Sequence, residues 1–255
     1  MRLLFLGDIV GSAGRHAVTR LVPQLRKELE LDYVVVNGEN SAGGRGIMPA
    51  QADELFACGV DVISGGNHTF QHREIYDYLD STPAILRPIN YPEGVPGHGV
   101  ATVGELTVVN VIGRTFMGGE YDDPFRAMDR VLATIDPNQY IFVDLHAEAT
   151  SEKQAMGWYL DGRVTAVVGT HTHVPTADHR VLPRGTAYCS DAGMCGARDS
   201  IIGDDIEAVL RRFLTQMPTR LPAAKGPSMI NGVIIEADPK TRRAVSIERC
   251  DRMVC

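Results

Sequence analysis

Short apolar runs of strand type alternate with segments of helical periodicity along most of this 255-residue chain. Near the start the runs are LLFLG, YVVVNG and DVISGG, and helices are expected between them over 18–29 and 49–58. Such short runs, bounded by glycine and polar residues, are typical of buried strands. Their alternation with helices is typical of βαβ units, in which a crossover helix joins two parallel strands. The pattern therefore predicts an α/β fold built on a parallel sheet.

The rest of the chain adds antiparallel pairs to this pattern. Helices are expected over 73–79, 124–135, 152–160 and 204–217, and YIFVDL and TAVVGT predict further buried strands. The stretches GVATVGELTVVNVIG and NGVIIEADPKTRRAVSIERC each place two β-rich runs around a turn, which predicts antiparallel hairpins and mixed sheets. Because no linker-like segment or internal repeat interrupts the chain, we expect a single domain over residues 1–255.

Chemically related side chains follow the strand-type runs. In open parallel α/β sheets the carboxyl ends of the strands line the ligand crevice, so these side chains are expected to converge there. They are Asp8 after LLFLG, Glu39 and Asn40 after YVVVNG, Asn67 and His68 after DVISGG, His146 after YIFVDL, and His171 and His173 after TAVVGT.

The chemistry of this set indicates a metal centre. Carboxylates, carboxamides and imidazoles together suit manganese, iron or zinc better than magnesium or calcium. The set holds more donors than one metal needs, whereas a pair of metals about 3.5 to 4 Å apart, bridged by one carboxylate, would use them. His171 and His173 straddle Thr172 on an extended segment or a loop, and could serve neighbouring metals.

Two other interpretations remain open. In a nucleotide-cofactor domain, Gly7, Gly11 and Gly14 would form the pyrophosphate turn and Glu39 would bind the ribose. Their spacing differs from G-x-G-x-x-G, however, and Asp8 would place a negative charge beside the phosphates. The other alternative is a non-catalytic, regulatory protein that keeps metal for structure, although structural sites are usually closed and rich in sulfur.

Charge and cysteine content limit the partners and the compartment. A formal net charge of −7 argues against an extended nucleic-acid groove, which needs clustered Lys and Arg. The five cysteines are scattered and contain no C-x-x-C pair, so we expect reduced thiols in a cytoplasmic protein. No apolar run has the length of a signal-peptide core or a membrane span, so no membrane partner is expected, while a homo-oligomer stays open. The cysteines are Cys58, Cys189, Cys195, Cys250 and Cys255.

The motifs GDIVG, NGEN, GGNHTF, DLHAEATSEK, GTHTHVPTAD and SDAGMCG occur in this order along nearly the whole chain. In these motifs the sequence resembles the YmdB-like branch of the calcineurin-like metallophosphoesterases. The resemblance implies a four-layer α/β/β/α sandwich with mixed sheets and a dinuclear metal centre at the strand ends. It also implies phosphodiesterase activity toward 2′,3′-cyclic nucleotides.

The resemblance implies roles for the residues at the strand ends as well. The chain lacks the histidine of the usual Asp-x-His, having Val10 there, and has Glu39 where aspartate is the rule; both departures match the YmdB-like branch. Two divalent or mixed-valence metals are expected, iron first and manganese second. The implied roles are Glu39 as the bridge, Asp8, Asn40 and His173 as ligands of one metal, Asn67, His146 and His171 as ligands of the other, and His68 as the proton donor.

These roles predict a reaction. A metal-bound hydroxide is expected to attack the phosphorus of a small phosphodiester, with a 2′,3′-cyclic nucleotide of the cyclic AMP type as the substrate. His68 would protonate the leaving alkoxide. Arg45, in the loop SAGGRG, could shape the pocket or bind phosphate, or could belong to an ordinary surface loop.

Overall fold

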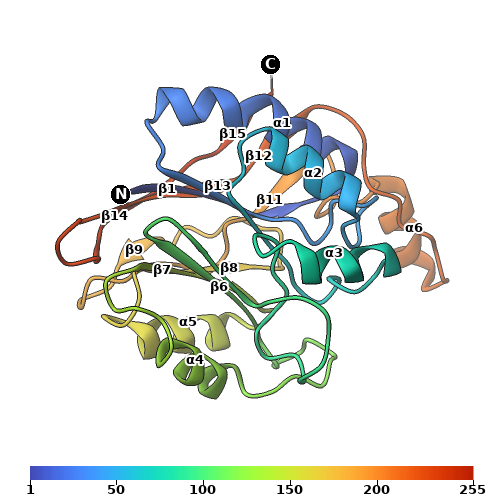
Figure 1. Cartoon of the computed structure of the whole chain (residues 1–255). Helices are drawn as coiled ribbons and strands as arrows, with labels where there is room; N and C mark the ends of the chain where they lie inside the picture. The colour runs from blue at the N-terminus through green and yellow to red at the C-terminus, as the bar shows by residue number, and fades with distance from the viewer. Residues whose placement is uncertain (255) are drawn as a thin grey trace.

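Two large β-sheets lie face to face at the centre of the molecule (Figure 1). The structure is a computed structural model and describes residues 1–254. The first sheet consists, in spatial order, of β14 (Ala244–Arg249), β13 (Gly232–Ala237), β1 (Arg2–Leu6), β3 (Tyr33–Asn37) and β4 (Val62–Ser64). The second consists of β5 (Val100–Val103), β6 (Leu106–Ile112), β7 (Tyr140–His146), β8 (Ala166–Thr170), β10 (Ala187–Cys189) and β9 (Arg180–Val181).

Both sheets combine parallel and antiparallel strands, as the sequence predicts. The strands β1, β3 and β4 are parallel to one another, and so are β6, β7, β8 and β10. The two predicted hairpins are present, because β5 pairs antiparallel with β6 and β13 pairs antiparallel with β14. The carboxyl ends of the parallel strands therefore face the same edge in each sheet, where a ligand crevice is expected.

Helices cover the outer face of each sheet (Figure 1). On the first sheet lie α1 (Gly11–Glu28), α2 (Pro49–Ala57), and the 3₁₀ turn η1 (Arg73–Ile75), which continues into α3 (Tyr76–Ser81). On the second lie α4 (Pro124–Leu132) and α5 (Thr150–Leu160), while α6 (Ile206–Thr215) lies at one side of the molecule. The predicted four-layer α/β/β/α arrangement is confirmed.

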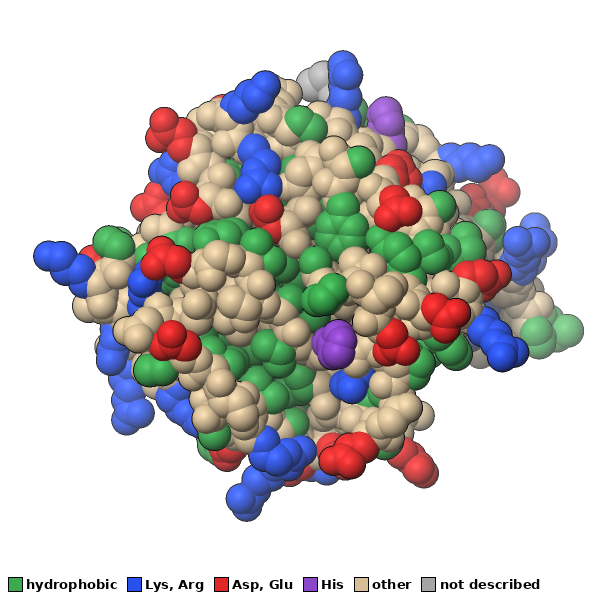
Figure 2. Space-filling model, viewed as in Figure 1, with side chains coloured by type: hydrophobic (Ala, Val, Ile, Leu, Met, Phe, Trp, Pro, Cys, Tyr) green, Lys and Arg blue, Asp and Glu red, His purple; other side chains and the backbone are tan. Residues whose placement is uncertain are grey.

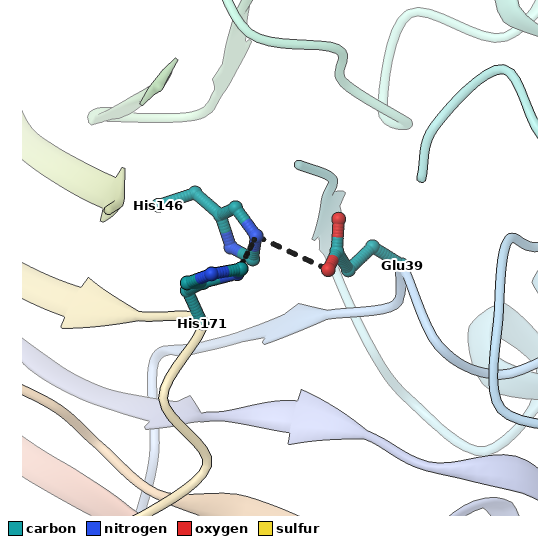
Figure 3. Close-up of side chains that lie close together, drawn as sticks. All are labelled: Glu39, His146 and His171. Atoms are coloured by element: carbon teal, nitrogen blue, oxygen red, sulfur yellow. Dashed lines mark hydrogen bonds and ion pairs between the residues drawn. The ribbon is translucent and has the colours of Figure 1, made fainter. Parts of the chain in front are cut away.

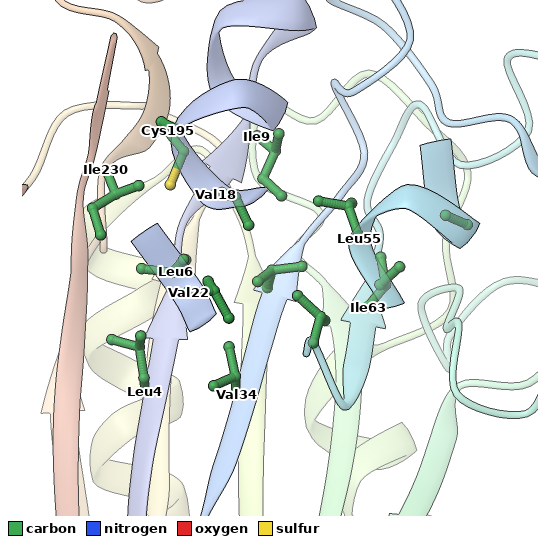
Figure 4. Close-up of a cluster of buried hydrophobic side chains, with 14 of the residues drawn as sticks. Leu4, Leu6, Ile9, Val18, Val22, Val34, Leu55, Ile63, Cys195 and Ile230 are labelled. Atoms are coloured by element: carbon green, nitrogen blue, oxygen red, sulfur yellow. The ribbon is translucent and has the colours of Figure 1, made fainter. Parts of the chain in front are cut away.

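The strand β1 shows why its sequence is a continuous apolar run. Leu4 and Leu6 face outward and pack against Val18 and Val22 of α1 (Figure 4). Leu3 and Phe5 belong instead to the core between the two sheets. A strand buried on both faces has no position for an alternating polar residue, so LLFL is the pattern such a strand requires.

A small third sheet gave no signal in the sequence. It consists of β15 (Arg252–Met253), β12 (Ser228–Ile230), β11 (Met194–Ala197) and β2 (Asp8–Ile9). The helix α1 packs on this sheet so closely that a Cβ at Gly14 would lie 2.2 Å from the carbonyl oxygen of Cys195. The prediction that this helix begins at residue 18 was wrong, because α1 begins at Gly11. Gly11 and Gly14 lie within the helix and permit close packing, and they do not form a turn before it.

Four of the five cysteines are free thiols: Cys58, Cys189, Cys195 and Cys250. The fifth, Cys255, lies outside the described residues. Among residues 1–254 no helix combines the length and the apolar character that crossing a membrane requires.

Candidate metal centre

The polar residues predicted at the strand ends all lie in one region of the structure, where the carboxyl ends of strands from both large sheets meet. Asp8 begins β2 directly after β1, and His146 is the last residue of β7. The others lie in loops that follow strands: Glu39 and Asn40 follow β3, Asn67 and His68 follow β4, and His171 and His173 follow β8.

One group of these side chains surrounds the ring of His146. Its Nε2 lies 3.1 Å from Glu39 Oε1, 2.9 Å from Asn67 Oδ1 and 3.1 Å from His171 Nδ1. Figure 3 shows Glu39, His146 and His171 turned toward a common point, and one ligand atom of each lies within 4.8 Å of the others. Four potential ligand atoms thus converge from strands of both large sheets.

Hydrogen bonds behind His146 fix which of its nitrogens faces this point. Thr170 Oγ1 lies 2.9 Å from His146 Nδ1 and donates its proton to Asp144 Oδ1 at 2.7 Å. Because the hydroxyl proton goes to Asp144, the Thr170 oxygen accepts the Nδ1 proton of His146. Burial raises the pKa of Asp144 to about 6, so this carboxyl is mainly ionised and able to accept at neutral pH.

The other two histidines are held in the same way. His171 Nε2 lies 3.1 Å from Glu148 Oε2, and His173 Nδ1 lies 2.7 Å from the carbonyl oxygen of Ile202. A neutral imidazole that donates from its outer nitrogen keeps a lone pair on its inner one. Metal-binding histidines are almost always oriented in this manner.

A second group contains Asp8, Asn40 and His173. His173 Nε2 lies 2.9 Å from the Asn40 amide and 3.8 Å from Asp8 Oδ1. In the amide orientation that satisfies its neighbours, Asn40 Nδ2 donates to the carbonyl oxygen and to Oε1 of Glu39, both at 3.1 Å, and its Oδ1 faces His173. Glu39 therefore lies between the two groups, as a bridging ligand must.

Asp8 carries a buried oxygen without a partner. Its side chain is fully buried, and Oδ2 accepts the backbone N–H of His171 at 3.0 Å. Its Oδ1 accepts no hydrogen bond from any described residue. An unpaired buried carboxylate oxygen is costly, and a cation is the kind of partner that would satisfy it.

These observations fit metal ions. Lone pairs from carboxylates, amide oxygens and imidazoles face one another, and such a donor set needs positive charge between its members. Gly66 leaves room for them, because a Cβ there would lie 2.2 Å from Glu39 Oε2 and 2.4 Å from Cδ2 of His146. The glycine before Asn67 is thus required by the crowding of the centre.

The two histidines of the G-T-H-T-H motif adopt an uncommon backbone. The φ angles of His171 and His173 are +97° and +65°, so the expected extended segment is wrong and the alternative, a loop, is correct. Positive φ angles in residues other than glycine persist only where the surroundings impose them, and they concentrate at functional sites.

Electrostatics in this region favour the metal-binding forms of Glu39 and His171. Burial acts to raise the pKa of Glu39, but the neighbouring His146 outweighs it and holds this pKa below its usual range. Burial, together with His146, lowers the pKa of His171 to about 3. At neutral pH Glu39 is therefore ionised and His171 is neutral, which are the forms in which these groups bind metals. Burial acts to lower the pKa of His146, but Glu39 and Asp8 outweigh it and raise this pKa to about 9, so a metal ion would replace a proton on this ring.

A cavity of about 610 Å³ opens over the two groups. Glu39, Asn40, His68, His171 and His173 line one part of it. Arg45, Arg212 and Arg220 line another part, and none of these three forms an ion pair with a residue of the described chain. Figure 2 shows acidic and basic side chains interspersed over one face of the molecule.

Two of these arginines were missed by the sequence analysis. Arg212 lies on α6 and Arg220 in the segment that follows it, and no local motif connects them with residues near position 40. For Arg45 the sequence allows either a pocket residue or a residue of an ordinary surface loop, and the structure places it at the cavity.

The glycine-rich turn near the N-terminus is not arranged as a pyrophosphate cradle. A Cβ at Gly7 would lie 1.9 Å from the carbonyl oxygen of Gly193, so this glycine permits close contact between chain segments. The backbone N–H of Gly11 donates to the carbonyl oxygen of Asn40 at 2.9 Å. These glycines serve internal packing, and the dinucleotide interpretation loses its main support.

Known proteins are similar to this chain over nearly its full length. A 2′,3′-cyclic-nucleotide 2′-phosphodiesterase of Bacillus subtilis (strain 168) is 48% identical over 254 residues, which are 98% of this chain and 96% of that protein. The crystal structure of a hypothetical protein from Thermus thermophilus matches with a TM-score of 0.93 and 44% identity, covering 99% of both chains. The crystal structure of a novel phosphatase from Mycoplasma pneumoniae matches with a TM-score of 0.92 and 32% identity, covering 99% of this chain and 93% of that one.

The fold is that of the calcineurin-like metallophosphoesterases, and the protein is a hydrolase. A sequence model of the family described as YmdB-like protein matches residues 4–250. The chain therefore belongs to the YmdB-like family.

Proposed function

We propose that this chain is a dinuclear-metal phosphodiesterase that hydrolyses small phosphodiesters, with 2′,3′-cyclic nucleotides as its substrates. The substrate class comes from the similarity to the Bacillus subtilis protein of that name. The metal dependence rests on one observation: each of three histidines has one ring nitrogen within hydrogen-bonding distance of an oxygen outside the centre, and its other ring nitrogen faces the carboxylates and amides of the centre. A single-domain organisation and a cytoplasmic location stay predictions.

The ligands divide into two sets around Glu39. The proposed assignment gives Asp8, Asn40 and His173 to one metal, Asn67, His146 and His171 to the other, and Glu39 to both. Iron is the first expectation and manganese the second, because mixed nitrogen and oxygen donors suit both. When bound, the metals supply concentrated positive charge, which neutralises a phosphodiester and lowers the pKa of water.

His68 is the proposed proton donor. Its backbone N–H donates to Glu39 Oε2 at 3.1 Å, which holds the residue beside the bridging carboxylate, and its half-buried ring lines the cavity. The leaving alkoxide of a ribose ester needs a proton. Burial lowers the pKa of His68, so its imidazolium is a stronger acid toward that alkoxide, although a smaller fraction of the ring is protonated at neutral pH.

The cavity arginines are proposed to bind the anionic substrate. A volume of about 610 Å³ lies within the range of small-molecule sites. Arg45, Arg212 and Arg220 provide local positive charge in a protein of net charge −7, so a small anion can be attracted despite the acidic surroundings.

Glu39→Gln tests this proposal most directly. A neutral amide is a poor bridge between two cations, so the variant should lose metal and nearly all activity toward 2′,3′-cyclic AMP. Elemental analysis after reconstitution with Fe²⁺ or Mn²⁺ should find two metals in each wild-type chain. Glu54→Gln is a matched control, because Glu54 pairs with Arg15 on the surface and should be dispensable. Less than one metal per wild-type chain, or a fully active Glu39→Gln, refutes the dinuclear phosphodiesterase.

A further inference from the structure

A buried ion pair lies behind the candidate metal centre. Lys153 on α5 and Asp191 after β10 are each 1% exposed, and Lys153 Nζ lies 2.7 Å from Asp191 Oδ2. The lysine stem passes β8 where Gly169 has no side chain, since a Cβ there would lie 3.1 Å from Lys153 Cδ. Buried ion pairs add little stability compared with apolar side chains of similar size, so another role is expected for this one.

Both oxygens of Asp191 are occupied by hydrogen bonds from loops. Oδ2 accepts from the backbone N–H of Thr172 at 3.1 Å and from its hydroxyl at 2.8 Å, in addition to the lysine. Oδ1 accepts from the backbone N–H of Gly193 at 2.8 Å. An ionised carboxylate can accept from all of these donors, whereas an amide would turn its own NH₂ toward some of them.

Asp191 is connected to ligands from both groups of the candidate centre, through Thr172 in one loop and through Gly193 in its own loop. Thr172 separates His171 from His173, the two residues with positive φ. The carbonyl oxygen of Gly193 accepts the backbone N–H of Asp8 at 3.2 Å, and Asp8 in turn accepts the backbone N–H of His171. One buried carboxylate therefore fixes the backbone on both sides of the centre.

We propose that Lys153, Asp191 and Thr172 are positioning residues for the metal centre. Asp191 holds Thr172, and this keeps His171 and His173 in the backbone conformation with positive φ. In that conformation each histidine faces its own group of ligands. Lys153 neutralises Asp191, so that the anchor adds no net charge close to the cations. This inference rests on the proposed dinuclear function, because it assigns the pair a task only if the histidines bind metal.

The first test changes Thr172, where a substitution should disturb folding least because the residue is only half-buried. Thr172→Val keeps the shape of the side chain and removes the hydroxyl that donates to Asp191, whereas Thr172→Ser keeps that hydroxyl. Competition with a chelator should show Mn²⁺ bound about 10-fold or more weakly by Thr172→Val, since residues that orient ligands commonly contribute this much to affinity. Thr172→Ser should bind Mn²⁺ as the wild type does. Wild-type affinity in a folded Thr172→Val overturns the proposal.

A second test removes the ion pair without leaving an unpaired charge. The double variant Lys153→Met with Asp191→Asn is expected to fold, because both changes keep side-chain size and neither buries a lone charge. It should bind Mn²⁺ more weakly than the wild type, because the new amide cannot accept from every donor around it. Asp161→Asn is the control: Asp161 is another buried carboxylate at the end of α5, and it accepts from the backbone N–H of Arg184 far from the centre. It should lower the melting temperature and leave Mn²⁺ affinity unchanged.

Mn²⁺ binding by the wild type distinguishes a failure of this inference from a failure of the proposed function. If wild-type protein binds no Mn²⁺ in the same competition, the dinuclear function itself fails. If wild type binds two Mn²⁺ and the folded double variant binds them equally well, the ion pair is only structural and the positioning role is overturned. If the double variant does not fold, the comparison of Thr172→Val with Thr172→Ser decides the question.

Discussion

At the scale of single residues, neighbouring positions in the sequence have different tasks. Asn67 and His68 are adjacent, yet Asn67 Oδ1 faces His146 Nε2 at 2.9 Å whereas the His68 ring lines the substrate cavity. The backbone N–H of His68 donates to Glu39, so the backbone of His68 is held beside the proposed bridging carboxylate. The proposed ligand and the proposed proton donor can therefore be tested by separate mutations.

His68→Ala should keep both metals and lose activity selectively. Cleavage of 2′,3′-cyclic AMP expels a basic ribose alkoxide, so kcat/KM should fall by about 10²- to 10⁴-fold when its proton donor is removed. A nitrophenyl phosphodiester expels a stabilised anion that needs little protonation, and its kcat/KM should change much less. The comparison requires both substrates and a measured metal content for each preparation.

Asn67→Ala supplies the contrast for this experiment, because it should lose metal and depress both activities together. If His68→Ala keeps its metals but loses both activities equally, His68 positions the phosphate and the acid must be another group.

At the scale of elements, the strands were predictable and the contacts between distant loops were not. The apolar run before Asp8 and the polar residues at the ends of β3, β4, β7 and β8 carry local signals. The two large sheets and the eight candidate site residues could therefore be predicted. The division of the ligands between two metals came from the resemblance to a known family. The spacing of these residues in the sequence does not indicate which metal each of them would bind.

Other features depend on tertiary contacts. The third sheet has strands of two to four residues, too short for a recognisable pattern. Gly14 resembles a turn residue in sequence, and only its contact with Cys195 explains why a helix passes through it. Arg212 and Asp191 lie far along the chain from residues that they approach in space, so sequence alone could not connect them with the site.

The half-buried carboxylate of Asp178 connects the loop after β8 to the end of β10 by hydrogen bonds. Asp178 Oδ1 accepts from the hydroxyl of Thr176 at 2.7 Å and from the backbone N–H of Ser190 at 3.1 Å. Partial burial acts to raise the pKa of Asp178, but the hydrogen bonds from Ser190 and Thr176 outweigh it and hold the pKa below its usual value. A carboxyl with a lowered folded-state pKa stabilises the protein when ionised.

Asp178→Asn should therefore destabilise the protein in a pH-dependent manner. The contribution of Asp178 is fully present above the unfolded-state pKa of about 3.9 and is lost as the pH falls through the lower folded-state pKa. Urea unfolding at pH 6 to 7 should show a loss of about 1 kcal/mol in the variant, the usual size for such hydrogen bonds. The difference between wild type and variant should shrink below about pH 4. A difference that stays constant down to pH 3 would contradict this account.

At the scale of the whole molecule, the two sheets are held together by a core to which both contribute. Phe5 of β1 and Phe142 of β7 meet there, with ring centroids 4.8 Å apart. The residues of the candidate centre come from both sheets. The packing of this core therefore also fixes the distance between the centre residues of the first sheet and those of the second. Stability and the geometry of the site are therefore coupled through the same packing.

Phe5→Ala should lower the free energy of unfolding by about 3–5 kcal/mol, the usual effect of removing a buried phenyl ring. Urea unfolding of the metal-free protein measures this without a contribution from bound metal. Phe116→Ala is the control, because Phe116 is 85% exposed and its removal should change the free energy by no more than about 0.5 kcal/mol. Equal effects of the two changes would show that the core between the sheets is not the main source of stability.

The pairing of β1 with β13 has a consequence for the order in which the protein becomes complete during synthesis. β1 lies between β3 and β13, Gly7 donates its backbone N–H to Asn231, and Asp8 donates its own to Gly193. During translation Gly7 and Asp8 emerge from the ribosome well before Asn231 and Gly193, to which they donate. Asp8 therefore cannot reach its final position until these later segments have been synthesised, so the candidate centre is completed only after β13 has emerged.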